Sequence, residues 1–178
     1  DRIYNAIVWQ DRRTTDICSN YKDHESMIQS KTGLVLDPYF SATKIRWILD
    51  NVKDAQLRAE AGQLCFGTVD SFLMFHLSKG VIHKTDLTNA SRTMLFNINN
   101  LDWDEDLLKL FNIPRKLLPS VHKCDHEFGT APLLNNITIN GVLGDQQSAM
   151  FGQGCLSVGS SKSTYGTGCF LMLSLIHI

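Results

Sequence analysis

The sequence contains 178 residues, 43% of them apolar and 20% charged, with a net charge of −1 at pH 7. This composition is typical of a globular protein with one domain, or one domain and the start of a second. A nearly neutral chain gives no reason to expect nucleic acid or an anionic membrane as partner, and no apolar run reaches the roughly 18 residues of a membrane span. The five cysteines are widely spaced without a C-x-x-C pair. They favour reduced thiols, so we expect a cytoplasmic protein without a metal site built from its side chains.

The first sixty residues contain a short apolar run followed by three helical segments. Residues 6–9 predict a buried strand, and residues 12–30 are mostly helical with a break near Asp23. A helix begins near Ser41, and another covers residues 55–61 before Gly62. The apolar stripe of the helix at Ser41 follows the spacing i, i+3, i+4, i+7: Ile45, Ile48, Leu49 and Val52.

Strand and helix signals alternate through the middle of the chain. Residues 64–66 and 94–96 predict short strands, and Thr68 is suited to cap a helix that closes at Gly80. We expect the inner face of that helix to consist of Val69, Phe72, Leu73 and Leu77. Asp102 and Glu105 form a capping-box-like start for a helix through Phe111.

The last forty residues predict a strand, a helix and a hairpin. Ile137 and Ile139 alternate with polar residues and predict a strand that leads to Asp145. A helix over residues 146–153 follows, and residues 161–165 and 169–173 then fold as two strands about a glycine turn. Strands alternating with helices indicate an α/β architecture, and the shift to Gly and Ser near residue 154 predicts a domain junction.

Two motifs in this last part carry the chemistry. Asp145, within Gly-Asp-Gln-Gln, offers a carboxylate after an apolar run, and residues 165–170 (YGTGCF) form a glycine-bracketed turn whose N–H groups can approach a phosphate. Together they predict a site where a nucleotide phosphorylates a small hydroxyl compound. Each motif also has a plain structural interpretation, a helix cap for Asp145 and an ordinary hairpin turn for the glycines.

Six segments in consistent order resemble the FGGY family of carbohydrate kinases, and within it the members that phosphorylate glycerol. They are NAIVWQDRRT (5–14), YFSATKIRWILDN (39–51), FGTVD (66–70), TDLTNASRT (85–93), GDQQ (144–147) and YGTGCF (165–170). The resemblance implies the actin/hexokinase-like (ribonuclease H-like) α/β fold. It implies that residues 1–153 are the latter part of the first domain and that residues 154–173 open the second. Residues 174–178 depart from the family pattern and are expected to be a non-native tail.

The resemblance also implies roles for single residues. Asp145 would be the general base that accepts the proton of the attacking hydroxyl, and Gln146 and Tyr39 would contact the same substrate. Trp9 and Phe170 would enclose the three-carbon chain of glycerol between their rings. The turn residues that would bind the nucleotide phosphates are Gly166, Thr167 and Gly168.

The implied reaction is transfer of the ATP γ-phosphoryl group to glycerol, with Mg²⁺ as cofactor and ADP and sn-glycerol 3-phosphate as products. The intact enzyme is expected to be a homo-oligomer. The family's Asp-x-Gly-Thr phosphate loop and substrate-gripping Arg-Glu pair are not in this sequence, so we expect an internal fragment without turnover of its own. Two alternatives stay open: a kinase of another small polyol or sugar, and a non-catalytic actin-like binding module.

Overall fold

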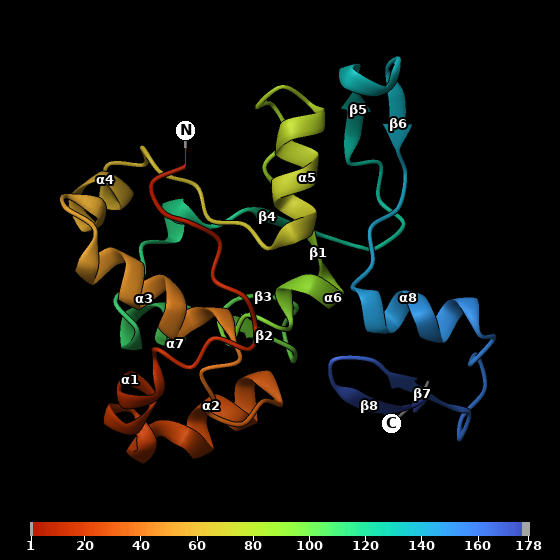
Figure 1. Cartoon of the computed structure of the whole chain (residues 1–178), viewed down its shortest axis with the longest axis horizontal. Helices are drawn as coiled ribbons and strands as arrows, with labels where there is room; N and C mark the ends of the chain where they lie inside the picture. The colour runs from red at the N-terminus through yellow and green to blue at the C-terminus, as the bar shows by residue number, and fades with distance from the viewer. Residues whose placement is uncertain (1, 176–178) are drawn as a thin grey trace. The chain divides into compact units, whose positions relative to one another are not determined.

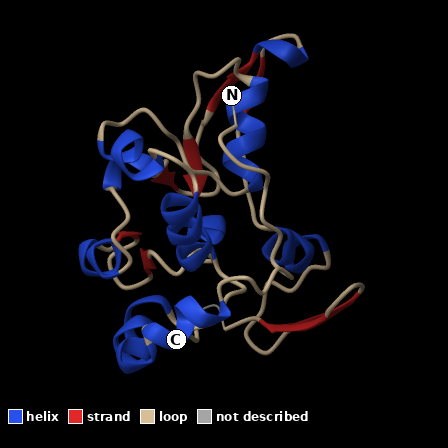
Figure 2. Ribbon diagram, turned by 60° about the vertical axis from the view of Figure 1, so that its left-hand side comes forward, coloured by secondary structure: helices blue, strands red, loops and turns tan. Residues whose placement is uncertain are grey.

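The computed structural model of the chain describes residues 2–175 and divides into two compact units (Figure 1). Unit 1 comprises Asp1–Val142 and unit 2 comprises Leu143–Ile178. Helices predominate and the strands are short (Figure 2). Residues 176–178 of the expected non-native tail lie outside the described residues.

The helices of unit 1 follow the sequence pattern closely. The predicted break near Asp23 is a 3-10 helix at Lys22–His24 that separates α1 from α2. Gly33, with φ of 71°, ends α2 in the left-handed conformation that glycine adopts without steric penalty. The α-helices of this unit are α1 (Thr15–Asn20), α2 (Glu25–Thr32), α3 (Ser41–Asn51), α4 (Ala55–Glu60), α5 (Val69–Leu77), α6 (Leu87–Ala90) and α7 (Glu105–Leu110).

The strands of unit 1 form three two-stranded pairs. β1 (Lys84–Asp86) runs parallel to β4 (Ser120–His122), with Thr85 opposite Val121. β2 (Phe96–Asn97) and β3 (Asp102–Trp103) are antiparallel, as are β5 (Gly129–Ala131) and β6 (Ile137–Ile139). In Figure 1, α5 lies beside β1, with which it is in contact.

The core of unit 1 is built from these helices and the loops that follow them. Side chains with almost no exposed surface include Phe96, Leu107 and Phe111, and burial of each large apolar side chain contributes about 2 kcal/mol. A second, smaller cluster comprises Met74, Ile82 and Phe128. Trp103 is buried and its indole Nε1 donates to the carbonyl of Pro119 at 2.7 Å, so the polar atom of the ring is satisfied.

The described residues of unit 2, 143–175, form one helix and one hairpin. α8 (Asp145–Gly152) is followed by β7 (Ser161–Tyr165) and β8 (Cys169–Leu173), which pair antiparallel with Tyr165 opposite Cys169. Both strands have the bounds that the sequence predicts. Gly166, Thr167 and Gly168 therefore form the three-residue connection of a hairpin.

Three local predictions are wrong, and a fourth, the strand at residues 94–96, is displaced to β2 at Phe96–Asn97. Residues 6–9 and 64–66 are not strands, because a short apolar run pairs only if a partner strand is available; Val8 is instead in a turn whose carbonyl accepts from Asp11 N. The inner face of α5 is also wrong, since Val69, Phe72 and Leu73 are more than half exposed while Met74 is buried.

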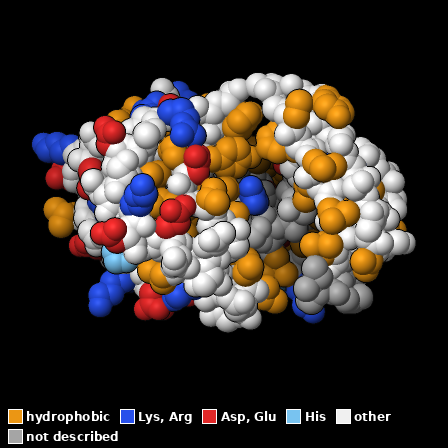
Figure 3. Space-filling view, turned by 90° about the horizontal axis from the view of Figure 1, so that it is seen from below, with side chains coloured by type: hydrophobic (Ala, Val, Ile, Leu, Met, Phe, Trp, Pro, Cys, Tyr) orange, Lys and Arg blue, Asp and Glu red, His pale blue; other side chains and the backbone are white. Residues whose placement is uncertain are grey.

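Charged side chains of both signs are interspersed over the left part of the view in Figure 3, and apolar side chains are more prominent over the rest. This distribution agrees with the net charge of −1. It gives this face no extended basic surface of the kind that binds a polyanion.

Candidate functional site

Two of the predicted substrate residues, Trp9 and Tyr39, meet in unit 1. Their ring centroids are 5.5 Å apart with the planes tilted by 48°. Tyr39 precedes α3 and is held by Asp37, whose carboxylate accepts from the Tyr39 N–H at 2.7 Å. Trp9 is 41% exposed, so part of its surface is open to a ligand.

Lys44 of α3 contacts the backbone of both residues of this aromatic pair. Its Nζ donates to the backbone carbonyl of Tyr39 at 3.1 Å and lies 3.5 Å from that of Trp9. The residue is only 6% exposed, and burial lowers the pKa of its ammonium because the charged form loses water. Lys44 therefore joins the two segments that carry the rings.

The remaining predicted residues lie in unit 2. Gly166 N donates to the carbonyl of Gly168 at 3.0 Å across the turn, and Thr167 is exposed between them. A Cβ built on Gly166 would meet no atom within 4 Å. The space over this turn is therefore open to a ligand, and the exposed Thr167 can present its hydroxyl and N–H to phosphate oxygens.

Asp145 and Gln146 open α8 directly after the buried Gly144. The Asp145 carboxylate is exposed and accepts from Gln146 N at 2.9 Å through Oδ1, while Gln146 Nε2 lies 3.4 Å from Oδ2. Gln146 itself is tied to the hairpin, since Lys162 Nζ donates to its Oε1 at 2.5 Å. A carboxylate in this setting keeps lone pairs available for a proton.

The donor sets present fit a nucleotide with Mg²⁺. Exposed carboxylate oxygen suits Mg²⁺ through a bound water, and an open glycine turn suits phosphate oxygens. Asp145 would hold Mg²⁺ through that water, and Gly166–Gly168 would bind the phosphate oxygens. The encounter of Trp9 with Phe170 would join the two units, and it stays a prediction.

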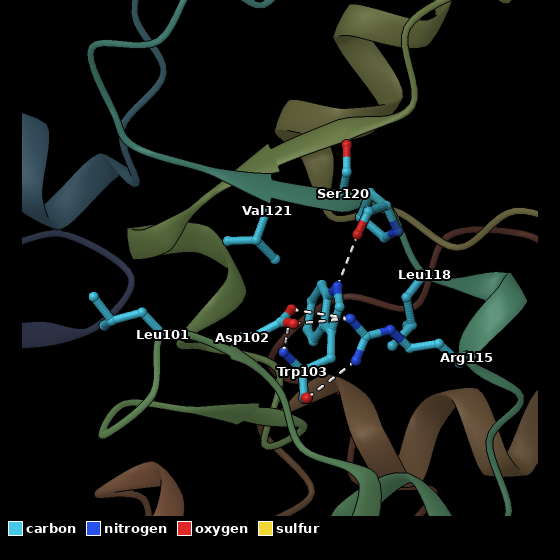
Figure 4. Close-up of a pocket in the computed structure, with 8 residues that line it drawn as sticks. Leu101, Asp102, Trp103, Arg115, Leu118, Ser120 and Val121 are labelled. Atoms are coloured by element: carbon cyan, nitrogen blue, oxygen red, sulfur yellow. Dashed lines mark hydrogen bonds and ion pairs between the residues drawn. The ribbon is translucent and has the colours of Figure 1, made fainter.

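A surface hollow of about 510 Å³ in unit 1 contains none of the predicted site residues. Figure 4 shows the Arg115 guanidinium in this hollow, between the Asp102 carboxylate and the Trp103 carbonyl. Arg115 donates to Asp102 at 3.0 Å, to Trp103 O at 3.1 Å and to Glu105 at 3.2 Å. These contacts join β3 and α7 to the 3-10 helix at Arg115–Leu117, so they give Arg115 a structural role.

Comparison with known proteins decides the family. The model of the FGGY family of carbohydrate kinases, N-terminal domain, matches residues 1–152. The chain belongs to the FGGY family of carbohydrate kinases. This FGGY chain is 58% identical over 175 residues to a glycerol kinase of Ectopseudomonas mendocina, a match that covers 96% of the chain and 35% of the relative.

Solved structures of two kinases have the same fold. The structure of Plasmodium falciparum glycerol kinase with ADP matches with a TM-score of 0.92 and 40% identity, over 97% of this chain and 36% of that one. A ligand-bound xylulose kinase from Lactobacillus acidophilus matches with a TM-score of 0.82 at 20% identity, over 96% and 36% of the two chains. The FGGY chain thus has the expected α/β, actin/hexokinase-like fold and spans about a third of the length of these relatives. Among the described residues, no helix is long and apolar enough to cross a membrane.

Sequence reasoning missed the two buried lysines next to the predicted site residues, Lys44 and Lys162. Both are less than 10% exposed, although lysine is among the residues least often buried. Lys162 alternates with serines in a strand, which gave no reason to single it out. Lys44 lies among five successive buried residues of α3, residues 42–46. A helical stretch that is buried on all sides has no apolar periodicity that would single out its buried residues.

Proposed function

We propose that this chain is part of a glycerol kinase that transfers the γ-phosphoryl group of ATP to glycerol, giving sn-glycerol 3-phosphate and ADP. The observation that carries the proposal is the 58% identity with a relative of that name. The structural match to a glycerol kinase with ADP, at 40% identity, supports the use of ATP.

In this proposal Asp145 accepts the proton of a glycerol hydroxyl as its oxygen attacks the γ-phosphorus. The bond between the γ-phosphorus and the oxygen bridging to the β-phosphate breaks, and ADP leaves. Gln146 and Tyr39 hydrogen-bond the acceptor, and Trp9 and Phe170 shield its carbon chain. Mg²⁺ supplies charge neutralisation on the phosphates when bound.

The turn at Gly166–Gly168 binds phosphate oxygens through the Thr167 hydroxyl and N–H groups. Its open surface supports this role, because nothing within 4 Å fills the space beside Gly166. Phosphoryl transfer requires positioning more than covalent chemistry, so a hairpin turn that presents donors is suited to the task.

We also infer the domain organisation and setting. Residues 1–153 belong to the first FGGY domain and residues 154–173 open the second, with residues 174–178 as a non-native tail; the family match to residues 1–152 supports this boundary. All five cysteines are free thiols, which supports a cytoplasmic location. We further propose a homo-oligomer, for which light scattering of the complete enzyme is the measurement.

The test is Asp145→Asn in the complete enzyme that contains this chain. Loss of the general base is expected to lower kcat by on the order of 10²-fold, with the KM for ATP little changed. Asp16→Asn, which removes an exposed carboxylate from α1, is the matched control and is expected to keep full activity. ADP release coupled to a dehydrogenase assay measures both.

Three outcomes would count against the proposal. Near-normal turnover of Asp145→Asn removes Asp145 from its role. A higher kcat/KM for another polyol or sugar than for glycerol favours the first alternative, a kinase of different specificity. Absence of phosphorylation of any small polyol in the complete wild-type protein favours the non-catalytic binding module.

A further inference from the structure

Lys162 is a buried cation without an acidic partner among the ion pairs of the described residues. It lies in β7 and is 3% exposed. Its Nζ donates to two neutral oxygens, Gln146 Oε1 at 2.5 Å and Thr164 Oγ1 at 2.6 Å. Removing an ammonium from water is costly unless other groups compensate, and an apolar side chain would pack here without that cost. The position therefore suggests a task besides stability.

The first effect of Lys162 is on the orientation of the Gln146 amide. An ammonium group has donors only, so the amide must turn its oxygen toward Lys162. The Nε2 group then faces the other way, and it lies 3.4 Å from Asp145 Oδ2. Lys162 thus selects one of the two ways in which the Gln146 amide can point.

The second effect is on the position of α8 relative to the hairpin within unit 2. Lys162 and Thr164 share one face of β7, and their partners across the pair are Met172 and Phe170 of β8. Thr164 Oγ1 also lies 3.5 Å from Gln146 Oε1. The first turn of α8 is therefore held against the hairpin face that carries Phe170.

We propose that Lys162 is a positioning residue that sets the Gln146 amide for the acceptor alcohol and, through Gln146, steadies the Asp145 carboxylate. The inference rests on the proposed function, in which Gln146 and Asp145 contact the acceptor. Lys162 itself touches neither substrate nor nucleotide in this scheme. Loss of the Lys162 side chain is therefore expected to weaken binding of the acceptor alcohol more than binding of ATP.

The first experiment detects the contact between Lys162 and Gln146 directly, without any assay of activity. In the ¹⁵N-labelled 178-residue chain, Lys162→Met is expected to shift the side-chain amide signals of Gln146 and to speed their exchange with water. Ser163→Ala, on the exposed opposite face of the same strand, is the matched control and should leave these signals in place. Unchanged Gln146 signals in a folded Lys162→Met chain would overturn the proposal.

The second experiment is a double-mutant cycle in the complete enzyme. Lys162→Met is expected to raise the KM for glycerol about 10-fold and to lower kcat several-fold, while the KM for ATP stays within about twofold. Because Lys162 acts through Gln146, the variant carrying both Lys162→Met and Gln146→Leu should be no worse than the worse single variant. Losses that multiply, or equal increases in both KM values, would contradict the inference.

A conservative variant covers the case in which Lys162→Met fails to fold. Lys162→Arg keeps a cationic donor for Gln146, so its KM for glycerol is expected to stay within about fivefold of the wild-type value. An increase in this KM as large as that caused by Gln146→Leu would contradict the proposal. Failure of the proposed function is separable from failure of this inference. Full activity of Asp145→Asn would contradict the proposed function. The Gln146 signals test the contact between Lys162 and Gln146 independently of activity.

Discussion

At the scale of single residues, Asp104 shows how one buried carboxylate holds several segments of unit 1 together. It is 6% exposed and caps α7 by accepting from the N–H groups of Asp106 and Leu107. It also accepts from Lys31 Nζ at 2.8 Å and from Asn97 Nδ2 at 2.7 Å. Burial alone would raise the pKa of Asp104, but the hydrogen bonds from Lys31 and Asn97 outweigh burial and lower it.

Asp104→Ala is therefore expected to lower the free energy of unfolding by about 3 kcal/mol at pH 7, because α7 loses its cap and Lys31 its buried partner. A carboxyl with a lowered folded-state pKa stabilises fully above its ordinary value of 3.8. That contribution is lost as the pH falls through the folded-state pKa. The difference between wild type and variant should thus shrink from pH 6 to the lowest pH at which the chain stays folded, as measured by urea unfolding.

The control is Asp106→Ala, which removes the second carboxylate that pairs with Lys31. Lys31 Nζ lies 2.6 Å from Asp106, but the Asp106 side chain is 75% exposed. Exposed ion pairs contribute about 0–1 kcal/mol, so the expected loss is correspondingly small. Equal losses for the two variants, or a loss for Asp104→Ala that does not depend on pH, would contradict this assignment.

At the scale of elements, α5 shows that apolar spacing fixes a helix but not the face that it buries. As predicted, α5 begins after Thr68, although the Thr68 side chain makes no cap hydrogen bond and the helix ends at Leu77. Its buried residues are Asp70, Ser71 and Met74. Asp70 accepts from Thr85 Oγ1 at 2.7 Å, and Ser71 Oγ donates to the carbonyl of Lys84 at 2.7 Å. The polar side of α5 is thus turned toward β1, because its polar groups find partners there.

This orientation makes a prediction about two apolar residues of α5. Met74 is 3% exposed and packs with Ile82 and Phe128, whereas Phe72 is 57% exposed. Met74→Ala is expected to lower the free energy of unfolding by about 3 kcal/mol, and Phe72→Ala by less than about 1 kcal/mol. Chemical denaturation followed by circular dichroism compares them, and a larger loss for Phe72→Ala would show that the opposite face is buried.

The elements that the sequence predicts well are those whose signals are local. The hairpin of β7 and β8 is predicted to the residue, since two glycines fix the turn and the strands pair with each other. The α7 cap is displaced from Asp102 to Asp104, a difference of two residues within one acidic segment. Residues 6–9 fail because strand formation depends on a partner far away in the chain, which one sequence does not reveal.

The residues of the candidate site also differ in how far the sequence pointed to them. Residue chemistry offers Asp145 and the glycine turn as candidates, but their roles, like those of Trp9, Tyr39 and Phe170, rest on family resemblance. Lys44 and Lys162 escaped prediction because a lysine is expected at the surface, and only the three-dimensional structure shows each one enclosed beside a predicted site residue.

At the scale of the whole molecule, the apolar core found among residues 2–175 lies in unit 1. Its largest cluster extends from Ile28 to Leu118, and the smaller one lies between Met74 and Phe128. In the described part of unit 2, residues 143–175, no large apolar side chain is buried; the buried side chains there belong to Lys162 and Ser174. Hydrophobic burial is the main favourable term in folding, so unit 2 has little of its own to stabilise it.

Hydrogen exchange of the 178-residue chain is expected to separate the two units. Amides of α3 and α7 should exchange only through global opening, whereas those paired between β7 and β8 should exchange at least about 10²-fold faster through local opening. A chain shortened to residues 1–142 supplies the comparison, and it should lose less than about 1 kcal/mol of unfolding free energy relative to the longer chain. Equal protection of the hairpin and α3 would mean that unit 2 unfolds together with unit 1, and that the core of unit 1 also stabilises the strands that carry Lys162 and Phe170.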